Sequence, residues 1–299
     1  MGNRIMDRKT AEDFDQDLLD LYDKYAHGLI ERREFLTKAG KFAIGGITAS
    51  MLLDALSPNY ALANQVEVND PRIKVEKIEY NSPNGHGKIK ADLVRPSGGG
   101  KRGSVVVVHE NRGLNPYIAD VARRVAAAGF TAIAPDGLTP LGGYPGTDAE
   151  GKKMQRTLNK GKLLQDFFAA HDFVKADGNS NGKVGVVGFC YGGGVANAMA
   201  VKYPDLAAAA PYYGRQAKAA DVPNIKAKLV LHYGELDKRI AKGWPAFEAA
   251  LKANKTDYTA HIYENANHGF HNDTTPRYKK DAAELSWKRT IELFKSTLS

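Results

Sequence analysis

The stretch KVGVVGFCYGGGVANAMA, residues 183 to 200, decides the fold. It begins with a short β-branched run, 183–187, and ends with a small, helix-compatible run, 193–200. Between them lies Gly-Phe-Cys-Tyr-Gly, which contains Cys190, the single cysteine of the 299 residues. The two runs predict a buried strand followed by a helix. The glycines allow a tight turn between them, because a Cβ there would collide with the neighbouring strand or helix.

A strand, a sharp G-x-nucleophile-x-G turn and a helix form the nucleophile elbow of the α/β-hydrolases. The turn presents its central residue at the end of the strand in a strained backbone conformation. We therefore expect Cys190 to be a catalytic thiol. A single cysteine also excludes an intrachain disulfide and a zinc site built from several cysteines.

After residue 63 the chain alternates strand-like and helix-like runs. The predicted strands are 74–80, 88–94, 104–108, 130–134, 183–187, 207–213, 228–233 and 258–263, the first two as edge strands. The predicted helices are 118–128, 163–174, 191–203, 245–253 and 279–298, and 137–151 is a predicted loop. This alternation predicts an α/β-hydrolase fold, with a mostly parallel, doubly wound sheet and helices on both faces. Residues 64–299 have the size of one domain.

Residues 1–63 form a separate N-terminal extension with two interpretations. Arg32-Arg33-Glu34-Phe35-Leu36, a mildly apolar stretch (42–56) and Ala61-Leu62-Ala63 resemble a twin-arginine export signal, which implies a periplasmic protein. The alternative is a cytoplasmic protein that keeps an amphipathic helical extension, since residues 11–37 show helical spacing. The apolar stretch is too short and too polar for stable membrane insertion.

The charge of the chain is unevenly distributed. Residues 1–63 hold 8 basic and 10 acidic residues, and the remainder holds 34 basic and 24 acidic residues, for a net charge of +8. The lysines are scattered, without basic runs or interleaved aromatic residues, which argues against nucleic-acid binding. The hydrophobic content of 43% is that of an ordinary globular protein. We expect a monomer or a small homo-oligomer.

A catalytic thiol needs a base, and the base needs an acid to orient it. In this fold the acid and then the histidine follow the nucleophile in the chain, each after a strand. The strand 228–233 leads to Asp237, with Glu235 as the rival acid, and the strand 258–263 leads to His268. Both should reach the sheet edge where Cys190 lies. The predicted triad is Cys190, His268 and Asp237.

The other histidines are expected to have lesser roles. His271 follows His268 closely and is expected to line the substrate pocket. The remaining ones are expected to be structural or outside the site: His232 and His261 in strands, His86 and His171 at the surface or in a helix, and His27 before the domain.

The loop after the third predicted strand should complete an oxyanion hole. Its Asn111 backbone N–H and that of Tyr191, next to the thiol, are the expected donors. One such donor contributes about 3 kcal/mol to a tetrahedral transition state. Glu110 in the same loop has two interpretations: an ion pair with Arg112 or Arg123, or a carboxylate that hydrogen-bonds the thiol.

Six short runs of the chain together resemble the dienelactone hydrolases (carboxymethylenebutenolidases), over residues 75–298. They are Val-His-Glu-Asn-Arg-Gly-Leu-Asn (108–115), Ala-Pro-Asp (134–136), Gly-Phe-Cys-Tyr-Gly-Gly-Gly (188–194), Tyr-Tyr-Gly (212–214), Gly-Glu-Leu-Asp (234–237) and Asn-His-Gly-Phe (267–270). The resemblance implies hydrolysis of a small ester or lactone through an acyl-enzyme, without cofactor or metal. It also implies that Glu110 sets the protonation and position of the thiol.

The substrate contacts are less defined than the triad. Arg112, Tyr144 and His271 are the candidate substrate-binding residues. The resemblance implies an arginine a few residues past the catalytic histidine, where this chain has His271 and Asn272, with Arg277 further on. The alternatives are a thioesterase or small-peptide hydrolase on the same triad, or a non-enzymatic binding protein on a hydrolase scaffold.

Overall fold

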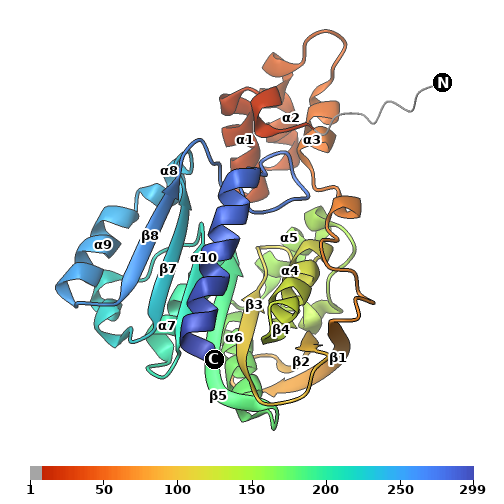
Figure 1. The fold of residues 1–299 in the computed structure, drawn as a ribbon. Helices are drawn as coiled ribbons and strands as arrows, with labels where there is room; N and C mark the ends of the chain where they lie inside the picture. Colours follow the sequence, from red (N-terminus) through yellow and green to blue (C-terminus); the bar gives the residue numbers. More distant parts are fainter. Residues whose placement is uncertain (1–8) are drawn as a thin grey trace.

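The computed structural model describes residues 9–299, so residues 1–8 of the predicted N-terminal extension lie outside it. An eight-stranded sheet runs through the centre in the order β1-β2-β4-β3-β5-β6-β7-β8 (Figure 1). The strands are β1 Ile73–Ser82, β2 Gly87–Pro96, β3 Arg102–Val108, β4 Thr131–Pro135, β5 Ser180–Phe189, β6 Ala208–Tyr212, β7 Lys228–Gly234 and β8 Tyr258–Tyr263. Only the β1–β2 and β2–β4 pairs are antiparallel. The predicted α/β-hydrolase fold is confirmed.

Helices cover both faces of this sheet. They are α4 Pro116–Ala127, α5 Asp148–Thr157, α6 Lys160–Ala176, α7 Tyr191–Lys202, α8 Lys238–Ala241, α9 Trp244–Ala253 and α10 Lys280–Leu298. Val106 and Val186 point to the face covered by α6, α7 and α9. Val105 and Val187 point to the opposite face, covered by α4 and α10. Since successive side chains of a strand alternate between faces, buried strands need apolar residues at every position.

Two local predictions differ from the structure. The strand predicted at 88–94 is present as β2, but its predicted position at the sheet edge is wrong, because β2 lies between β1 and β4 and residues 91–94 are all buried. The predicted loop 137–151 is only partly irregular, since α5 begins at Asp148 inside it. The Thr147 side chain caps that helix by accepting from the backbone N–H of Glu150.

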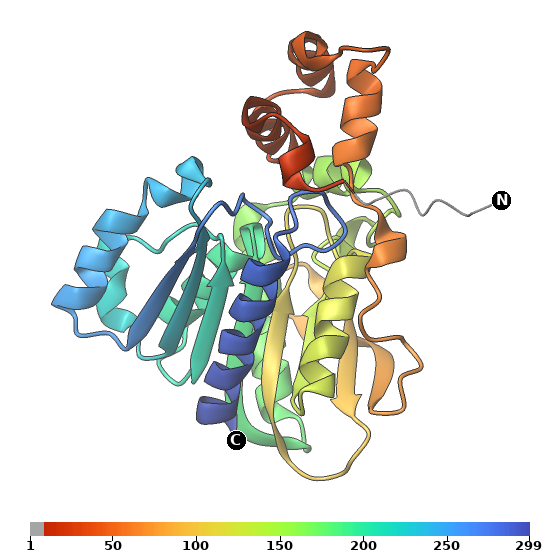
Figure 2. The same cartoon turned by 45° about the horizontal axis from the view of Figure 1, so that its top comes forward.

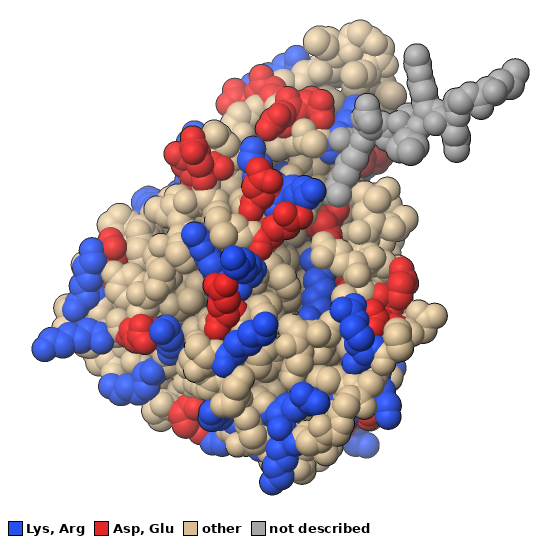
Figure 3. Space-filling model, viewed as in Figure 1, with Lys and Arg blue, Asp and Glu red and all other residues tan. Residues whose placement is uncertain are grey.

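The described part of the N-terminal extension, residues 9–63, forms a helical layer that we call the N-terminal cap. It holds α1 Gln16–Ala26, α2 Arg32–Ala39 and α3 Ala49–Leu56, which lie together beyond the end of the sheet (Figures 1 and 2). The cap has its own apolar cluster, built from Leu18, Leu19, Leu21, Tyr22, Ala26, Ile30, Phe35, Ala39, Leu52, Leu53 and Leu56. In Figure 3, acidic side chains gather over the cap at the top of the view.

No helix within residues 9–299 combines the length and the apolar character that a membrane crossing requires. The twin arginines, Arg32 and Arg33, form the first turn of α2, and the predicted apolar stretch contributes α3. The segment read as a possible signal is therefore folded in this structure.

The turn between β5 and α7 has the strain expected of a nucleophile elbow. Cys190 has φ 56° and ψ −111°, a region that residues with a Cβ seldom adopt. Its neighbours leave no space: a Cβ on Gly188 would lie 2.0 Å from the carbonyl oxygen of Gly192, and one on Gly192 would lie 2.3 Å from that of Val108. The close approach of β3, β5 and α7 therefore requires glycine at both positions.

Two adjacent glycines of α7 allow a matched test of this packing. A Cβ on Gly193 would lie 2.5 Å from the Tyr212 carbonyl oxygen, whereas one on Gly194 would meet Arg215 only at 3.5 Å. We expect Gly193→Ala to lower the free energy of unfolding by about 1–3 kcal/mol through overpacking. Gly194→Ala should leave it unchanged or raise it by up to about 1 kcal/mol through helix propensity. Urea denaturation measures both, and equal destabilisation would contradict the assigned packing.

Candidate active site

The three residues of the predicted triad meet at the C-terminal edge of the sheet. Cys190 follows β5, Asp237 follows β7 and His268 follows β8. The His268 Nδ1–H donates to the Asp237 carboxylate at 2.5 Å, and the His268 Nε2 lies within 4.8 Å of the Cys190 Sγ. All three side chains are buried. The rival acid Glu235 points elsewhere, since its carboxylate accepts from the backbone N–H of Asn265 at 2.9 Å.

The charges of the site favour a thiolate beside an imidazolium. Burial raises the pKa of Cys190, but the charges of His27 and His268 outweigh it and hold that pKa well below the ordinary value. Burial lowers the pKa of His268, but Asp237 and Cys190 outweigh it and raise that pKa to about 10. Cys190 also precedes the N-terminus of α7, which stabilises a negative charge. These effects all favour the ionised form of the thiol.

The structure places a second histidine in this site. His27 was expected to lie outside the domain, but its Nε2 lies 3.2 Å from the Cys190 Sγ and 3.1 Å from the His268 Nε2. It stands at the C-terminal end of α1, and its Nδ1 faces the carbonyl oxygen of Asp23 at 2.8 Å and the Asp23 carboxylate at 3.1 Å. Two Asp–His pairs thus converge on one thiol.

Only a weak sequence signal marks His27. Asp23 and His27 are spaced i, i+4 at the end of a charged helix, where such a pair is usually a surface feature. The contact with Cys190 joins residues 163 positions apart, so no local pattern could reveal it.

Side chains of the α/β body hold the C-terminal end of α1 in place. The last carbonyls of α1 and the turn after it accept from this body: Tyr25 from Lys152 at 2.8 Å, Ala26 from Asn111 at 2.9 Å and Gly28 from Arg156 at 2.6 Å. The last carbonyls of a helix lack partners within the helix, and the cationic donors Lys152 and Arg156 complement the negative end of the helix dipole.

Two further arginines anchor Asp23. Arg277 lies 3.4 Å from the Asp23 carboxylate and stacks over the Tyr22 ring at 5.1 Å. Arg239 lies 3.5 Å from the same carboxylate and 2.9 Å from the His27 Nε2. The cap is thus held against the site by ionic contacts from two sides.

Glu110 is buried behind the thiol. It lies 3.7 Å from Arg112 and accepts from the Asn272 side chain at 3.2 Å, whereas Arg123 binds Asp120 instead. Burial raises the pKa of the Glu110 carboxyl. The charge of Arg112 lowers this pKa, but burial and the charge of Cys190 together outweigh that effect. Of the two interpretations, the ion pair with Arg112 is the contact seen, and the carboxylate is close enough to influence the thiol.

The predicted oxyanion donors flank Cys190 from two elements. Tyr191 is the first residue of α7, and Asn111 lies in the loop after β3. The Asn111 side chain donates to the carbonyl of Ala26, so this loop is also held by the cap. Their role as backbone donors stays a prediction.

The three predicted substrate-binding residues do not gather around the thiol. His271 is buried in the core, where its Nδ1 lies 2.7 Å from the Tyr117 hydroxyl and its ring packs on that of Phe189. The prediction had placed this histidine in the wall of the substrate pocket. His271 differs from the prediction because the whole segment 271–275 folds into the protein interior and is buried. Arg112 is also engaged internally, with Asp148 at 2.7 Å.

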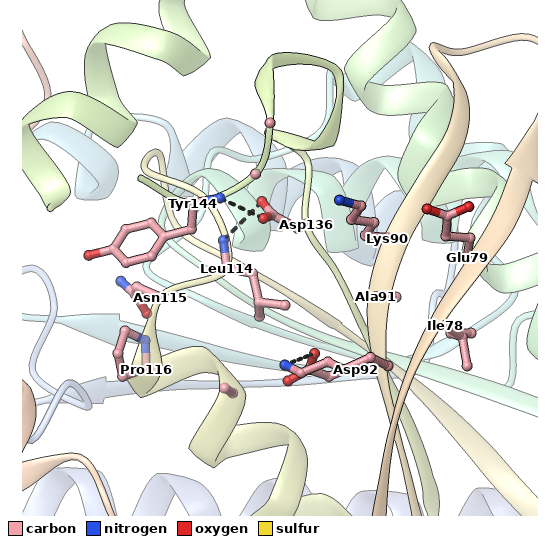
Figure 4. A pocket seen from close by; sticks show the side chains of 14 residues that line it. Ile78, Glu79, Lys90, Ala91, Asp92, Leu114, Asn115, Pro116, Asp136 and Tyr144 are labelled. Carbon is pink, nitrogen blue, oxygen red and sulfur yellow. Dashed lines mark hydrogen bonds and ion pairs between the residues drawn. The ribbon is translucent and has the colours of Figure 1, made fainter. Parts of the chain in front are cut away.

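Tyr144 lines a different hollow. This cavity of about 720 Å³ is bordered by residues of β1, β2 and the loop after β3, with Asp136 at its back (Figure 4). Asp136 accepts from the backbone N–H groups of Tyr144 and Leu114, and the Tyr144 hydroxyl donates to Asp148. Cys190 is not among its lining residues, so this larger cavity is separate from the candidate active site.

A recess of about 360 Å³ between the cap and the α/β body reaches His268. Its charged lining comes from α1, α8 and the segments around His268: Asp20, Asp23, Lys24, Asp237, Lys238, Arg239 and Arg277. Arg277, which the sequence left unplaced, therefore lies beside the site. The recess therefore has a wall of mixed charge that includes His268, although Cys190 is not among its lining residues.

Residues 89–298 match the dienelactone hydrolase family over most of the α/β body. The chain belongs to this family. The family predicted from the sequence is thus confirmed, and the protein is a dienelactone hydrolase-like hydrolase. Residues 6–42 match a second family, described as YqhI-like, which covers α1 and α2 of the cap.

Known proteins similar to this chain cover different parts of it. The "Putative hydrolase fragment YghX" of Escherichia coli is 60% identical over 114 residues, which are 38% of this chain and 97% of that protein. A "Putative carboxymethylenebutenolidase" of Saccharolobus solfataricus is 30% identical over 240 residues, 68% of this chain and 91% of that one. The crystal structure of a "Putative Dienelactone Hydrolase" from Klebsiella pneumoniae superposes with a TM-score of 0.65 at 24% identity, covering 74% and 98% of the two chains.

The ionisation of the thiol can be measured directly. Because Cys190 is the single cysteine, the far-ultraviolet absorbance of a thiolate reports on this residue alone, with Cys190→Ser as the blank. We expect a titration midpoint well below the ordinary value of about 8.5, because two imidazoles stabilise the anion. His268→Ala should shift the midpoint upward. A wild-type midpoint at or above the ordinary value would contradict the assigned ion pair.

Proposed function

We propose that this protein hydrolyses a small, activated carboxylic ester or lactone through a Cys190–His268–Asp237 triad and an acyl-enzyme. The observation that supports it is a strained elbow that presents Cys190 to an imidazole held by a carboxylate. The family of the chain supports the reaction class.

The first step is attack of the Cys190 thiolate on the substrate carbonyl carbon. The carbonyl electrons move to oxygen, and the backbone N–H groups of Tyr191 and Asn111 stabilise the oxyanion. The adduct collapses to a thioester, and the departing oxygen takes the proton from the His268 imidazolium. In a lactone this oxygen stays attached, so the ring opens.

The second step releases the acid. Neutral His268 takes a proton from water, whose oxygen attacks the thioester carbonyl, and the thiolate departs as the acid forms. Asp237 holds the imidazole in the tautomer with a proton on Nδ1, which leaves Nε2 to accept and donate protons. Glu110, buried next to the thiol, would adjust its position and charge.

The chemistry of a thiolate limits the substrate class. A thiolate attacks readily but is also expelled readily, so the leaving group must compete with it when the first adduct collapses. Enol lactones, aryl esters and thioesters satisfy this condition better than alkyl esters. Arg239 and Arg277, which line the recess beside His268, are candidate partners for a substrate carboxylate, and the name of the carboxymethylenebutenolidase relative supports such a substrate.

The triad assignment predicts a specific pattern of activity loss. On an activated aryl ester, Cys190→Ala should abolish turnover, and His268→Ala should lower kcat by about 10²- to 10⁴-fold because proton transfer is lost. Asp237→Asn, which can still cap α8, should also lower kcat, whereas the rival Glu235→Gln should leave it unchanged. Steady-state kinetics measure all four. Full activity of Cys190→Ala would sink the proposal.

We further propose that the active protein retains residues 1–63 and is not cleaved before Asn64. Two contacts between the cap and the α/β body support retention, since His27 contacts Cys190 and Asn111 donates to the Ala26 carbonyl. The cap also buries an apolar cluster of its own, as a folded part of a mature protein would. Cleavage would remove a histidine from the site and expose the recess.

Retention is tested on the protein from its native host. The intact mass should correspond to the full chain of 32.5 kDa, and paired Arg32→Lys and Arg33→Lys substitutions should leave its cell fraction unchanged, because export depends on the arginine pair. A mature chain beginning near Asn64 in the periplasmic fraction would reject the proposal and restore the export signal.

A further inference from the structure

Three metal-binding atoms meet at one point of the site. The Cys190 Sγ and the Nε2 atoms of His27 and His268 all lie within 4.8 Å of one another, with separations of 3.2 Å from His27 to sulfur and 3.1 Å between the two nitrogens. His27 comes from the cap and the other two from the α/β body. The acyl transfer proposed above uses the imidazole of His268 and gives no step to that of His27.

The orientation of both rings turns their Nε2 atoms toward each other, with the His27 Nε2 also facing the thiol. The Nδ1 of His27 faces two oxygen acceptors of Asp23, and the Nδ1 of His268 faces the Asp237 carboxylate, so both Nδ1 atoms carry a proton. Neutral imidazoles in this tautomer point unprotonated Nε2 atoms at each other. Such a contact of 3.1 Å needs a positive charge between the two nitrogens, which is a proton in the thiolate–imidazolium form of the site or a metal cation that replaces this proton.

We propose that Cys190, His27 and His268 bind a zinc-type divalent cation that joins the cap to the catalytic centre. Zn–N bonds of about 2.0–2.1 Å and Zn–S bonds of about 2.3 Å separate tetrahedral ligand atoms by about 3.3–3.6 Å, within about 0.4 Å of the two separations above. Thiolate and imidazole are the ligands that Zn²⁺ prefers, whereas Mg²⁺ and Ca²⁺ prefer oxygen. Three protein ligands leave a fourth position for water.

Each histidine also has the outer partner of a zinc ligand. Ligating histidines usually donate their second N–H to a carboxylate or carbonyl, which fixes the ring. Asp237 does so for His268, and the Asp23 carboxylate and carbonyl do so for His27. Arg277 and Arg239 hold Asp23 in turn.

The Arg239 side chain lies against one of the proposed ligand atoms, the His27 Nε2, and must move before a metal binds there. The Arg239 guanidinium lies 2.9 Å from the His27 Nε2, but its side chain is 37% exposed and is already 3.5 Å from the Asp23 carboxylate. It can turn fully toward that carboxylate when the metal enters. The carboxylates of Asp23, Asp237 and Glu110 and the thiolate offset the charges of the metal and the nearby arginines.

The metal would switch off acyl transfer, a consequence that rests on the proposed function. The Cys190 lone pair that attacks the carbonyl and the His268 Nε2 that moves protons would both be bound to the cation. The metal would also tie α1 to the site and cover the recess. Metal-free protein would hydrolyse esters, and Zn²⁺ would inhibit it reversibly.

The binding test uses Co²⁺ as a spectroscopic probe on chelator-treated full-length protein. We expect tetrahedral d–d bands and a near-ultraviolet thiolate-to-Co²⁺ charge-transfer band, both removed by Zn²⁺. Cys190→Ser should lose the charge-transfer band. Asp23→Asn should weaken Co²⁺ affinity about 10- to 100-fold, and His27→Ala should weaken it more, because a ligand itself is lost.

The matched control is His261→Ala, a half-exposed histidine of β8, which should bind Co²⁺ like the wild type. Circular dichroism checks that each variant is folded. A wild type without a charge-transfer band at millimolar Co²⁺, or an unchanged Co²⁺ affinity in folded His27→Ala, would overturn the site. Ester hydrolysis by the chelator-treated wild type is measured separately. If the protein binds Co²⁺ but hydrolyses no ester, the proposed function is rejected and the metal site is still supported.

Discussion

The strained turn at Cys190 is the constraint on which the rest of the site depends. A positive φ at a residue with a Cβ is costly, and it persists here because β3, β5, β6 and α7 approach so closely that only glycines fit around it. The turn directs the thiol beyond the sheet edge, at the N-terminus of α7, toward the loops that follow β7 and β8. Every other group of the site is arranged around that sulfur.

The second determinant is the pairing of charges around this thiolate. Asp237 and Asp23 each hold an imidazole, and both imidazoles face the Cys190 Sγ. In a buried site these groups are strongly coupled, so the low pKa of the thiol and the high pKa of His268 have one common cause. The function and the metal site proposed above both depend on this one arrangement of charges.

Local patterns were sufficient for most of the fold. The central strands, such as β3 and β5, contain buried apolar runs. Cys190, Asp237 and His268 each follow a strand, so their meeting follows from the parallel topology. The same reasoning failed where contacts with distant parts of the chain decide whether a side chain is buried or lines the pocket. It placed His271 in the pocket wall, although the segment after His268 folds into the core. It also missed α5, because the glycines just before this helix have positive φ angles and indicate a loop.

The sequence by itself determined the chemistry of this protein: one thiol in a glycine-framed turn, followed by an acid and a histidine at the ends of later strands. Only the tertiary structure decided what surrounds that thiol. The contact of His27 with Cys190 depends on α1 docking through its last carbonyls onto side chains of the α/β body. Such docking joins residues far apart in the chain, and its free energy comes from many separate hydrogen bonds and ion pairs that leave no local pattern.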